Sequence, residues 1–463
     1  MKLNYFNFKK IENKFLLTND FGNFLLVSPD EFKEIMTGEV TSDSLLGQQL
    51  LEHNMAYEGT KLEYSSLMRH ALHNIKGYVN TATSLHIFVV TTACNMKCVY
   101  CQANNGVTCA TMNMSNEIAE KAVDIALQSP AIHLSFEFQG GEPLLNFGII
   151  QHIVEYTENH KGEHNIMYNI VTNLSLITDD ILDFFVKYNF GVSTSIDGPE
   201  LIHNINRRYQ DGTGTYNTVA NSIQKVRSRG LHVGAIQTTT RASLKYPKEI
   251  VRAYKDLGFD NIFIRPLTPL GRAAICWDDI GYTADEFLTF YIEALDEIIK
   301  TNQAGYFLKE NHAGIMLKKI FGDYVNYMEL RSPCGAVIGQ IAYYADGDIF
   351  TCDEGRMLHE MGDHSFRLGN VYTHKYSDLI GSNVCRTVCA SSVLETSPTC
   401  CDCVYQPYCG SCPVVNYAQT GDLIAKSPRG FRCSIYAGIL DRLFKFLLFG
   451  ESRIVSILKT WCQ

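Results

Sequence analysis

The stretch that decides the fold is Thr91-Thr92-Ala93-Cys94-Asn95-Met96-Lys97-Cys98-Val99-Tyr100-Cys101. Its three cysteines are separated by three and then by two residues, and an apolar, strand-like segment at residues 85–90 leads into them. Three thiolates on one short loop suit a soft metal centre, for which an iron–sulfur cluster is the usual occupant. Because a four-iron cluster needs four ligands, three cysteines would leave one iron open to a small molecule.

Around this loop, apolar strands alternate with amphipathic helices from about residue 85 to 302. The pattern predicts strands at residues 85–90, 133–138, 168–172, 191–195, 232–238 and 261–265. It predicts helices at 116–128, 148–158, 179–188, 218–229, 248–257 and 283–300. Six such units indicate an α/β fold with a parallel sheet, closed into a partial (β/α)6 barrel. In such sheets the chemistry gathers at the carboxyl ends of the strands, where the cysteine loop lies.

Composition narrows the class of protein. The 463 residues, of which 46% are hydrophobic, suffice for one large core and a second module. A net charge of −9 argues against nucleic acid or an anionic membrane as the main partner. The apolar stretch at residues 434–450 is interrupted by Asp441, Arg442 and Lys445, which predicts a packing helix and no membrane span. Sixteen cysteines without a signal peptide indicate a reducing cytoplasm and metal ligation.

Cys94, Cys98, Tyr100 and Cys101 resemble the motif of radical S-adenosylmethionine (SAM) enzymes, which has an aromatic residue just before the third cysteine. The resemblance implies a four-iron cluster whose open iron is chelated by the amino and carboxylate groups of SAM. Reductive cleavage of SAM would then give a 5′-deoxyadenosyl radical. The alternative is three-quarters of a zinc knuckle, although zinc sites prefer paired cysteines.

Further candidates follow the next strands. Gly140-Gly141-Glu142-Pro143 resembles the family's Gly-Gly-Glu-Pro motif, in which the glycines allow close approach to a ligand and the glutamate holds the SAM amino group. The resemblance places Asn173 near cofactor or substrate, and Ser195 and Asp197 near the SAM ribose or carboxylate. Strand-end capping is the other interpretation of these three residues. Arg265 could bind a carboxylate or form a structural ion pair.

The cysteine-rich tail resembles the SPASM domain of peptide-modifying radical SAM enzymes, which carries up to two auxiliary four-iron clusters. Carried over in motif order, the first auxiliary cluster would be bound by Cys334, Cys352 and Cys412. The second would be bound by Cys400, Cys403, Cys409 and Cys433. The alternative for the whole tail is a pair of zinc sites.

The tail departs from the family pattern in two places. Cys409 and Cys412 are two residues apart, where the family often has three, and the cysteine that completes the first auxiliary cluster in some members would fall near Met328. The ligand completing that cluster therefore stays open. The remaining cysteines are expected to be small buried residues; they are Cys109, Cys276, Cys385, Cys389, Cys401 and Cys462.

Asp353 directly follows Cys352. In the sulfatase-maturing relatives an aspartate at that place of the motif is a catalytic base, so the resemblance implies that Asp353 takes up a substrate proton. Glu354 and Asp363 compete for this role, and an ordinary surface acid is the other interpretation.

Four regions are expected. Residues 1–82 form an N-terminal α+β region, with a hairpin around residues 19–22 and a helix that Ser28 and Glu31 start as a capping box. It is either a structural cap or, by partial resemblance to winged-helix elements, a leader-peptide-binding unit. The radical SAM domain spans 83–323, the SPASM domain 324–435 and a final helix 436–463.

Segments 137–147 and 353–358 narrow the resemblance to the radical SAM maturases of the His-Xaa-Ser peptide system. This implies a ribosomally made precursor peptide, an electron donor such as flavodoxin or ferredoxin, and a second maturase as partner. The expected reaction is hydrogen abstraction from a side-chain carbon, giving a crosslinked or oxidised residue. The alternatives are an anaerobic sulfatase maturase that makes formylglycine and a zinc-binding scaffold.

Overall fold

A computed structural model of the chain describes residues 1–103, 111–322, 327–424 and 430–462. Cys109 and the expected domain boundary at 323/324 lie outside the described residues. The other expected domain boundaries also remain predictions.

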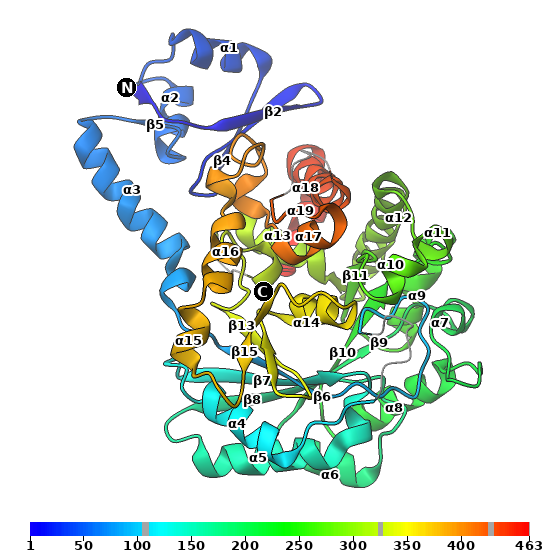
Figure 1. Cartoon of the computed structure of the whole chain (residues 1–463). Coiled ribbons are helices and arrows are strands. Elements are labelled where there is room, and N and C mark those ends of the chain that lie inside the picture. Colours follow the sequence, from blue (N-terminus) through cyan, green and yellow to red (C-terminus); the bar gives the residue numbers. More distant parts are fainter. Residues whose placement is uncertain (104–110, 323–326, 425–429, 463) are drawn as a thin grey trace.

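A ten-stranded sheet organises the chain (Figure 1). The six predicted strands are present and parallel, as β6 (Leu85–Thr91), β7 (His133–Gly140), β8 (Asn165–Val171), β9 (Gly191–Ser195), β10 (Val233–Thr238) and β11 (Asn261–Arg265). β12 (Lys309–Glu310) extends this sheet beyond β11. The expected partial-barrel α/β fold is confirmed.

Helices between the strands also follow the sequence pattern. They are α4 (Asn116–Ala126), α5 (Phe147–His160), α6 (Asp179–Lys187), α8 (Tyr216–Ser228), α9 (Pro247–Asp256) and α12 (Ala284–Gln303). Side chains of Ser115, Thr178 and Thr283 accept backbone N–H groups and so start three of these helices. Shorter helices that the pattern did not predict are α7 (Glu200–Asn206), α10 (Arg272–Ile275), α11 (Trp277–Ile280) and α13 (Asn311–Ile320).

The cysteine-rich region extends the same sheet instead of forming one of its own. β13 (Gln340–Tyr343) pairs in parallel with β6, and β14 (Asp348–Phe350) and β15 (Arg367–Asn370) continue antiparallel. Its helices are α14 (Asp353–Glu360), α15 (Tyr376–Ile380), α16 (Asn383–Ser391) and α17 (Pro413–Thr420). A small apolar cluster that includes Cys334, Cys352 and Cys412 separates from the main core here.

The chain ends in two helices, α18 (Phe431–Phe449) and α19 (Ser452–Thr460), where the sequence predicted one. The segment of Gly450 and Glu451 separates them. α18 packs against α12, and its apolar residues are buried in the core. Among the described residues, no helix has the length and apolarity that crossing a membrane requires.

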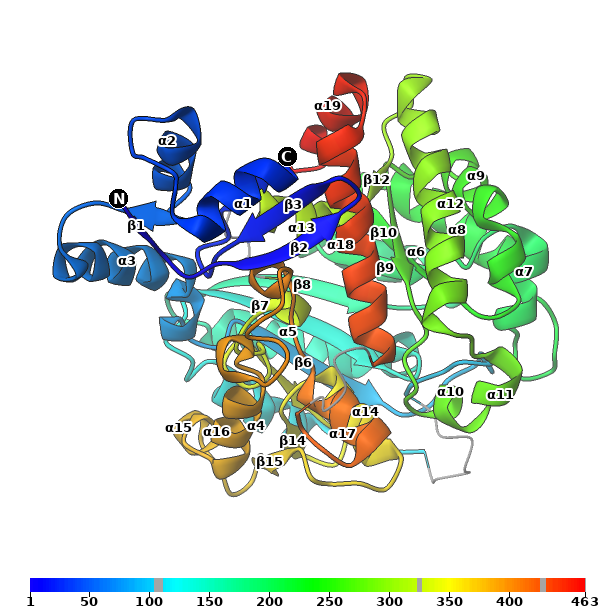
Figure 2. The same ribbon diagram turned by 90° about the horizontal axis from the view of Figure 1, so that it is seen from above.

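The N-terminal region has three antiparallel strands, β2 (Asn7–Ile11), β3 (Lys14–Thr18) and β4 (Phe24–Val27), and three helices, α1 (Pro29–Thr37), α2 (Leu45–Glu52) and α3 (Lys61–Ile75). β1 (Lys2–Leu3) pairs with β5 (Ala56–Tyr57). The Ser28–Glu31 capping box and the hairpin are present, whereas β1, β2 and β5 were not predicted. In Figure 2 this sheet lies beside α18, and Ile11 and Leu16 are buried in the main core.

Candidate active site

A cavity of about 640 Å³ opens at the carboxyl ends of the barrel strands. It is lined by Cys94, Cys98, Tyr100, Cys101, Gly140, Gly141, Glu142, Asn173, Ser195, Arg265 and Asp353. These residues come from separate parts of the sequence, and all were candidates by motif. Their assembly around one cavity is what a shared site requires; their individual roles remain predictions.

Backbone pairing holds the cysteine loop in place. Val99 N–H donates to the Asn206 carbonyl at 2.9 Å, and Lys97 N–H donates to the Arg208 carbonyl at 2.7 Å. Burial raises the pKa of the Cys94 thiol to about 12 and that of Cys98 to about 11. A thiolate in this loop therefore needs a cation beside it, which iron would supply.

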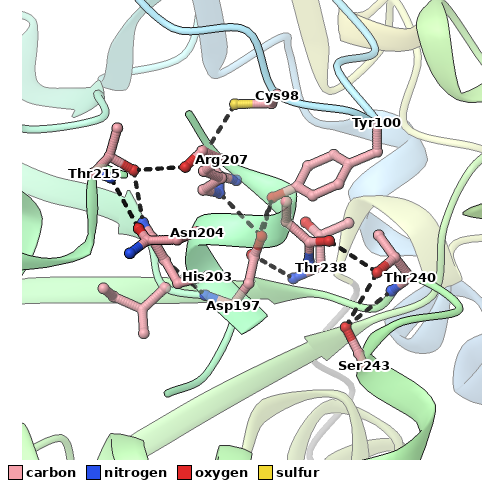
Figure 3. Close-up of polar contacts among 12 residues, drawn as sticks. Cys98, Tyr100, Asp197, His203, Asn204, Arg207, Thr215, Thr238, Thr240 and Ser243 are labelled. Atoms are coloured by element: carbon pink, nitrogen blue, oxygen red, sulfur yellow. Dashed lines mark hydrogen bonds and ion pairs between the residues drawn. The ribbon is translucent and has the colours of Figure 1, made fainter. Parts of the chain in front are cut away.

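Asp197 is fully buried beneath this loop (Figure 3). Its carboxylate accepts hydrogen bonds from the Tyr100 hydroxyl at 2.7 Å and from the Thr238 N–H at 3.2 Å. It also pairs with Arg207, whose Nε lies 3.3 Å away. The Asp197 N–H donates to His203 Nδ1 at 3.4 Å.

The expectation that Asp197 lies near the SAM ribose or carboxylate stays a prediction, although Asp197 is fully buried and is not among the residues that line the cavity. Along β9, burial alternates, so that Ser193 and Ser195 line the cavity while Thr194 is buried. The strand ends at Ser195, and the alternation with it, so Asp197 turns inward to bind Tyr100. Its geometry is that of a residue that positions the cysteine loop.

Arg207 is a site residue that the sequence did not reveal. Its Nη1 lies 3.9 Å from the Cys98 sulfur, and its guanidinium lies over the Tyr100 ring at 5.2 Å. A cation here would favour the thiolate form of Cys98. Arg207 ends α7, a short helix without a sequence signal, and only its contacts distinguish it from the neighbouring Arg208.

Glu142 is almost fully buried on the cavity wall. Its carboxylate accepts hydrogen bonds from Thr172 Oγ1 at 2.6 Å, Asn173 N–H at 2.7 Å and Leu144 N–H at 3.0 Å. Burial nevertheless raises the pKa of Glu142 to about 7. An ammonium group in the cavity would offset that burial and favour the carboxylate.

Gly140 and Gly141 bring β7 against the cysteine loop. A Cβ at Gly140 would lie 2.2 Å from the Thr91 carbonyl oxygen, and one at Gly141 would lie 2.2 Å from that of Ala93. The sequence suggested close approach to a ligand; in the structure the close neighbour is the backbone that leads into Cys94. A side chain at either position would displace that loop.

Asn173 links the end of β8 to the same loop. Its Nδ2 donates to Asn95 Oδ1 at 2.9 Å, and its Oδ1 accepts from Ser175 N–H at 2.9 Å. Because Asn95 follows Cys94, these contacts tie the loop to a second strand end.

Arg265 forms an ion pair inside the chain. Its Nη1 lies 2.6 Å from Glu329 Oε1, and Arg432 Nη2 lies 3.6 Å from Glu329 Oε2. The two cations lower the pKa of Glu329 to about 2 despite its burial. Of the two interpretations that the sequence left open, the structure shows the ion pair.

Asp353 lines the cavity at the start of α14. Its Oδ1 is 2.7 Å from Arg356 Nε, and Arg356 Nη2 donates to Gln139 Oε1 at 3.1 Å. Glu354 lines the same cavity, whereas Asp363 does not and accepts instead from Ser365 N–H at 2.8 Å. The geometry therefore leaves Asp353 and Glu354 as candidate bases.

Cys334, Cys352 and Cys412 meet at a second, smaller cavity that shares Met328, Glu329, Gln340 and Glu354 with the first. Cys352 and Cys412 occupy the N-cap positions of α14 and α17, and Gly355 N–H donates to the Cys352 sulfur at 3.4 Å. Helix N-termini favour negative charge, so the donor set suits an anionic metal–thiolate group.

The other four tail cysteines lie near the N-terminal sheet. Cys403 lies close enough to Cys400 and Cys409, and Cys433 close enough to Cys409, for their charges to interact. Asn7 of β2 donates to the Cys401 and Cys403 carbonyls at 3.0 and 3.3 Å. Within the described residues, no three His, Cys, Asp or Glu side chains are placed to hold a single metal ion.

The chain is similar to known proteins. Residues 88–244 match the Radical SAM superfamily. A protein of Methanocaldococcus jannaschii is 33% identical over 183 residues, which cover 40% of this chain and only 62% of that protein. The serine-type anaerobic sulfatase-maturating enzyme of Bacteroides thetaiotaomicron is 23% identical over 368 residues, which cover 74% of this chain and 86% of the enzyme.

Solved structures share the fold. The structure of anSMEcpe with bound AdoMet (S-adenosylmethionine) matches with a TM-score of 0.68 and 21% identity, covering 82% of this chain and 99% of that one. Streptococcus suis SuiB bound to S-adenosylmethionine matches with a TM-score of 0.54 and 16% identity, covering 94% and 99%. The match over residues 88–244, the parallel barrel and the three-cysteine loop agree, and together they show that this part of the chain is similar to the radical SAM superfamily.

Proposed function

We propose that this chain binds SAM at a four-iron cluster and removes a hydrogen atom from a side-chain carbon of a ribosomally synthesised peptide, leaving a crosslinked or oxidised residue. One observation carries the proposal. The large cavity joins the cysteine loop to Asp353 and to the edge of the three-thiol cavity. A peptide side chain in that space would face a radical source on one side and a base on the other.

The residues present fit the cofactors that the superfamily implies. Cys94, Cys98 and Cys101 would hold the cluster, which together with SAM supplies the radical chemistry. Glu142 would accept hydrogen bonds from the SAM ammonium group, and Asn173 and Ser195, which line the same cavity, would contact the rest of the cofactor. Tyr100 and Arg207, fixed by Asp197, hold the loop and place a positive charge beside Cys98.

Asp353 is proposed as the base that takes the proton which the substrate loses on oxidation. Arg356 orients its carboxylate and is itself held by Gln139, beside the Gly140-Gly141 turn. The tail cysteines would hold auxiliary clusters that accept the substrate's electron: Cys334, Cys352 and Cys412 one, and Cys400, Cys403, Cys409 and Cys433 the other.

The N-terminal region supports a precursor peptide as substrate. The match to anSMEcpe leaves 18% of this chain uncovered, whereas the match to SuiB, which has also been solved bound to precursor peptide SuiA, leaves 6%. Three antiparallel strands followed by three helices resemble winged-helix elements that bind leader peptides as an added strand. The exposed large apolar side chains are concentrated in the first 80 residues, Leu62 and Leu67 among them.

The narrower resemblance adds a peptide of the His-Xaa-Ser type and a second maturase as partner. Flavodoxin or ferredoxin is proposed as electron donor, and the many cysteines without a signal peptide support a cytoplasmic location.

A sulfatase maturase is the second candidate. Its support is the 368-residue similarity to the Bacteroides thetaiotaomicron enzyme, which reaches from the barrel into the cysteine-rich region. Under this alternative, the same cavity and Asp353 would oxidise a serine or cysteine side chain to formylglycine.

The test is incubation of anaerobically reconstituted protein with SAM, reductant and either a genomically neighbouring precursor peptide or a sulfatase peptide. Tandem mass spectrometry would locate the loss of two hydrogens or, at a cysteine converted to formylglycine, that loss together with the exchange of sulfur for oxygen from water. A crosslink or oxidised residue in the precursor supports the proposal, and formylglycine in the sulfatase peptide alone replaces it with the alternative. Without modification of either peptide, the proposal is wrong. Asp363→Asn is the matched control for Asp353→Asn, because Asp363 lies outside the cavity.

A further inference from the structure

The small cavity of Cys334, Cys352 and Cys412 holds three thiols where a four-iron cluster needs four ligands. By the resemblance, the cysteine that completes this cluster in some related proteins would fall near Met328, and the sequence has no cysteine there. The Met328 sulfur packs on the Gly335–Gly339 turn, because a Cβ at those glycines would lie 2.5 and 2.8 Å from it. The fourth ligand should therefore come from the other donors that line the small cavity.

Glu329 and Glu354 line this cavity, Asp353 lines only the larger cavity beside it, and two of these three carboxylates are already paired. Glu329 binds Arg265 and Arg432, and Asp353 binds Arg356. Glu354 lines both cavities, and among the described residues its carboxylate makes no ion pair and no hydrogen bond to another side chain. Leaving a carboxylate in such a place without a partner is costly unless a cation binds it.

We propose that Glu354 is the fourth protein ligand of the first auxiliary cluster, its carboxylate oxygen bound to the iron that the three cysteines leave open. The inference rests on the proposed function, since it presupposes that cluster. It differs from that proposal in taking Glu354 out of the competition with Asp353 for the role of base.

Surrounding charges support a cluster at this place. Helices α14 and α17 begin directly after Cys352 and Cys412, and their N-termini contribute positive potential. Arg432 lines the cavity, and its buried Nε has no hydrogen-bond partner in the described part of the chain. That N–H would be available to a bound cluster as a hydrogen-bond donor.

Cys389 competes with Glu354 for the role of fourth ligand, because it lies close enough to Cys334 for the two thiols to interact electrostatically. Its thiol, however, hydrogen-bonds with that of Cys385 one turn earlier on α16. A thiol occupied within its own helix is a weaker candidate than an unpaired carboxylate on the cavity wall.

The experiment uses the full chain with Cys94, Cys98 and Cys101 replaced by alanine, so that the remaining iron belongs to the tail. Glu354→Gln and Glu354→Cys are compared with Asp353→Asn and Cys389→Ala. Iron content, EPR and Mössbauer spectra are recorded before and after mild oxidation by ferricyanide. We expect Glu354→Gln to lose one iron per chain and to show a three-iron EPR signal. The parent and both controls should keep that iron.

Glu354→Cys should also keep the iron and shift the midpoint potential to a more negative value, because a thiolate donates more electron density than a carboxylate. That variant keeps the test decisive if Glu354→Gln folds poorly. Equal iron retention and spectra in Glu354→Gln and the parent would overturn the assignment, as would iron loss in Cys389→Ala. If replacing Cys334 and Cys352 removes no iron, the auxiliary cluster itself is refuted, and with it this part of the proposed function.

Discussion

The Tyr100 hydroxyl donates to the Asp197 carboxylate at 2.7 Å, and so joins the cysteine loop to the end of the fourth barrel strand. Arg207, directly after α7, pairs with the same carboxylate through Nε, and its Nη1 lies beside the Cys98 sulfur. The three residues fix one cysteine of the loop through contacts that bury the acid completely.

Asp197→Asn should destabilise the fold strongly. It leaves the Arg207 guanidinium, 12% exposed, without a counterion, and breaking a buried pair from one side costs about 3–5 kcal/mol. Tyr100→Phe removes only one hydrogen bond to the carboxylate, worth about 1.5–3 kcal/mol. Anaerobic urea unfolding of both variants checks the difference. Equal unfolding free energies would show that Asp197 does not carry the positioning role.

The barrel was predictable because its strands and helices follow local hydrophobic periods. Strand ends from β6 to β11 fall within a few residues of expectation, which is why the motifs at those ends were found together. The pairing of β13 with β6 was not predictable, since it joins residues 340–343 to 85–88 without any local signal. The continuous sheet is therefore a property of the tertiary fold alone.

The site was predictable where a spacing or a dipeptide marks it, as for Cys94, Cys98 and Glu142. Residues that contact the site only through a long side chain have no such motif in the sequence. Arg207, Glu329 and Arg432 look like ordinary surface charges in the sequence, and only the fold brings them against Cys98 and Arg265.

Replacing Cys94, Cys98 and Cys101 together by alanine should abolish SAM cleavage and leave the tail iron in place. The two cysteine groups line different cavities and depend on different segments. Iron per chain and 5′-deoxyadenosine formed under dithionite are the readouts. Undiminished deoxyadenosine would refute the assignment of the loop.

Asp353→Asn should allow SAM cleavage to continue while product per deoxyadenosine falls by on the order of 100-fold, the usual contribution of a general base. The base acts after hydrogen abstraction, so the earlier step should be unaffected. Deoxyadenosine and modified peptide are measured in one reaction, with Asp363→Asn as control. An unchanged ratio would exclude Asp353 as the base.

Leu67→Asp on α3 should weaken binding of the precursor peptide by about 10-fold, since one apolar side chain contributes about 1.5–3 kcal/mol when buried. SAM cleavage without peptide should persist. Ile132→Asp is the matched control, because Ile132 is 63% exposed and Leu67 61%. Calorimetry with the full precursor decides the matter, and equal affinities for both variants would contradict a peptide site on α3.

These point substitutions are preferable to deleting the N-terminal region. Ile11 and Leu16 are part of the main core, and Thr18 Oγ1 donates to the Val404 carbonyl at 2.7 Å. Removing residues 1–80 would uncover that core and the loop that carries Cys400 and Cys403. A loss of peptide binding would then have two causes.

Glu142 should make SAM binding depend on pH. Burial raises its pKa to about 7, so the carboxyl is mostly protonated at pH 6 before SAM binds. The same raised pKa favours the folded state at low pH, a contribution that is lost as pH rises from its ordinary value of 4.5 through 7. The SAM ammonium requires the carboxylate, so binding must release a proton below pH 7 and weaken by about 10-fold per pH unit.

Calorimetry of the cluster-loaded protein between pH 5.5 and 8, in buffers of different ionisation enthalpy, measures both the affinity and the released proton. Glu142→Gln should bind SAM more weakly at pH 8 and show neither the pH dependence nor the proton release. Its amide keeps the shape of the side chain, although Thr172 Oγ1 and Asn173 N–H donate to different carboxylate oxygens, so that one of them then faces the amide NH2 group. If the wild-type affinity is flat across this range, the ammonium does not bind at Glu142, and the cavity wall holds the cofactor by other groups.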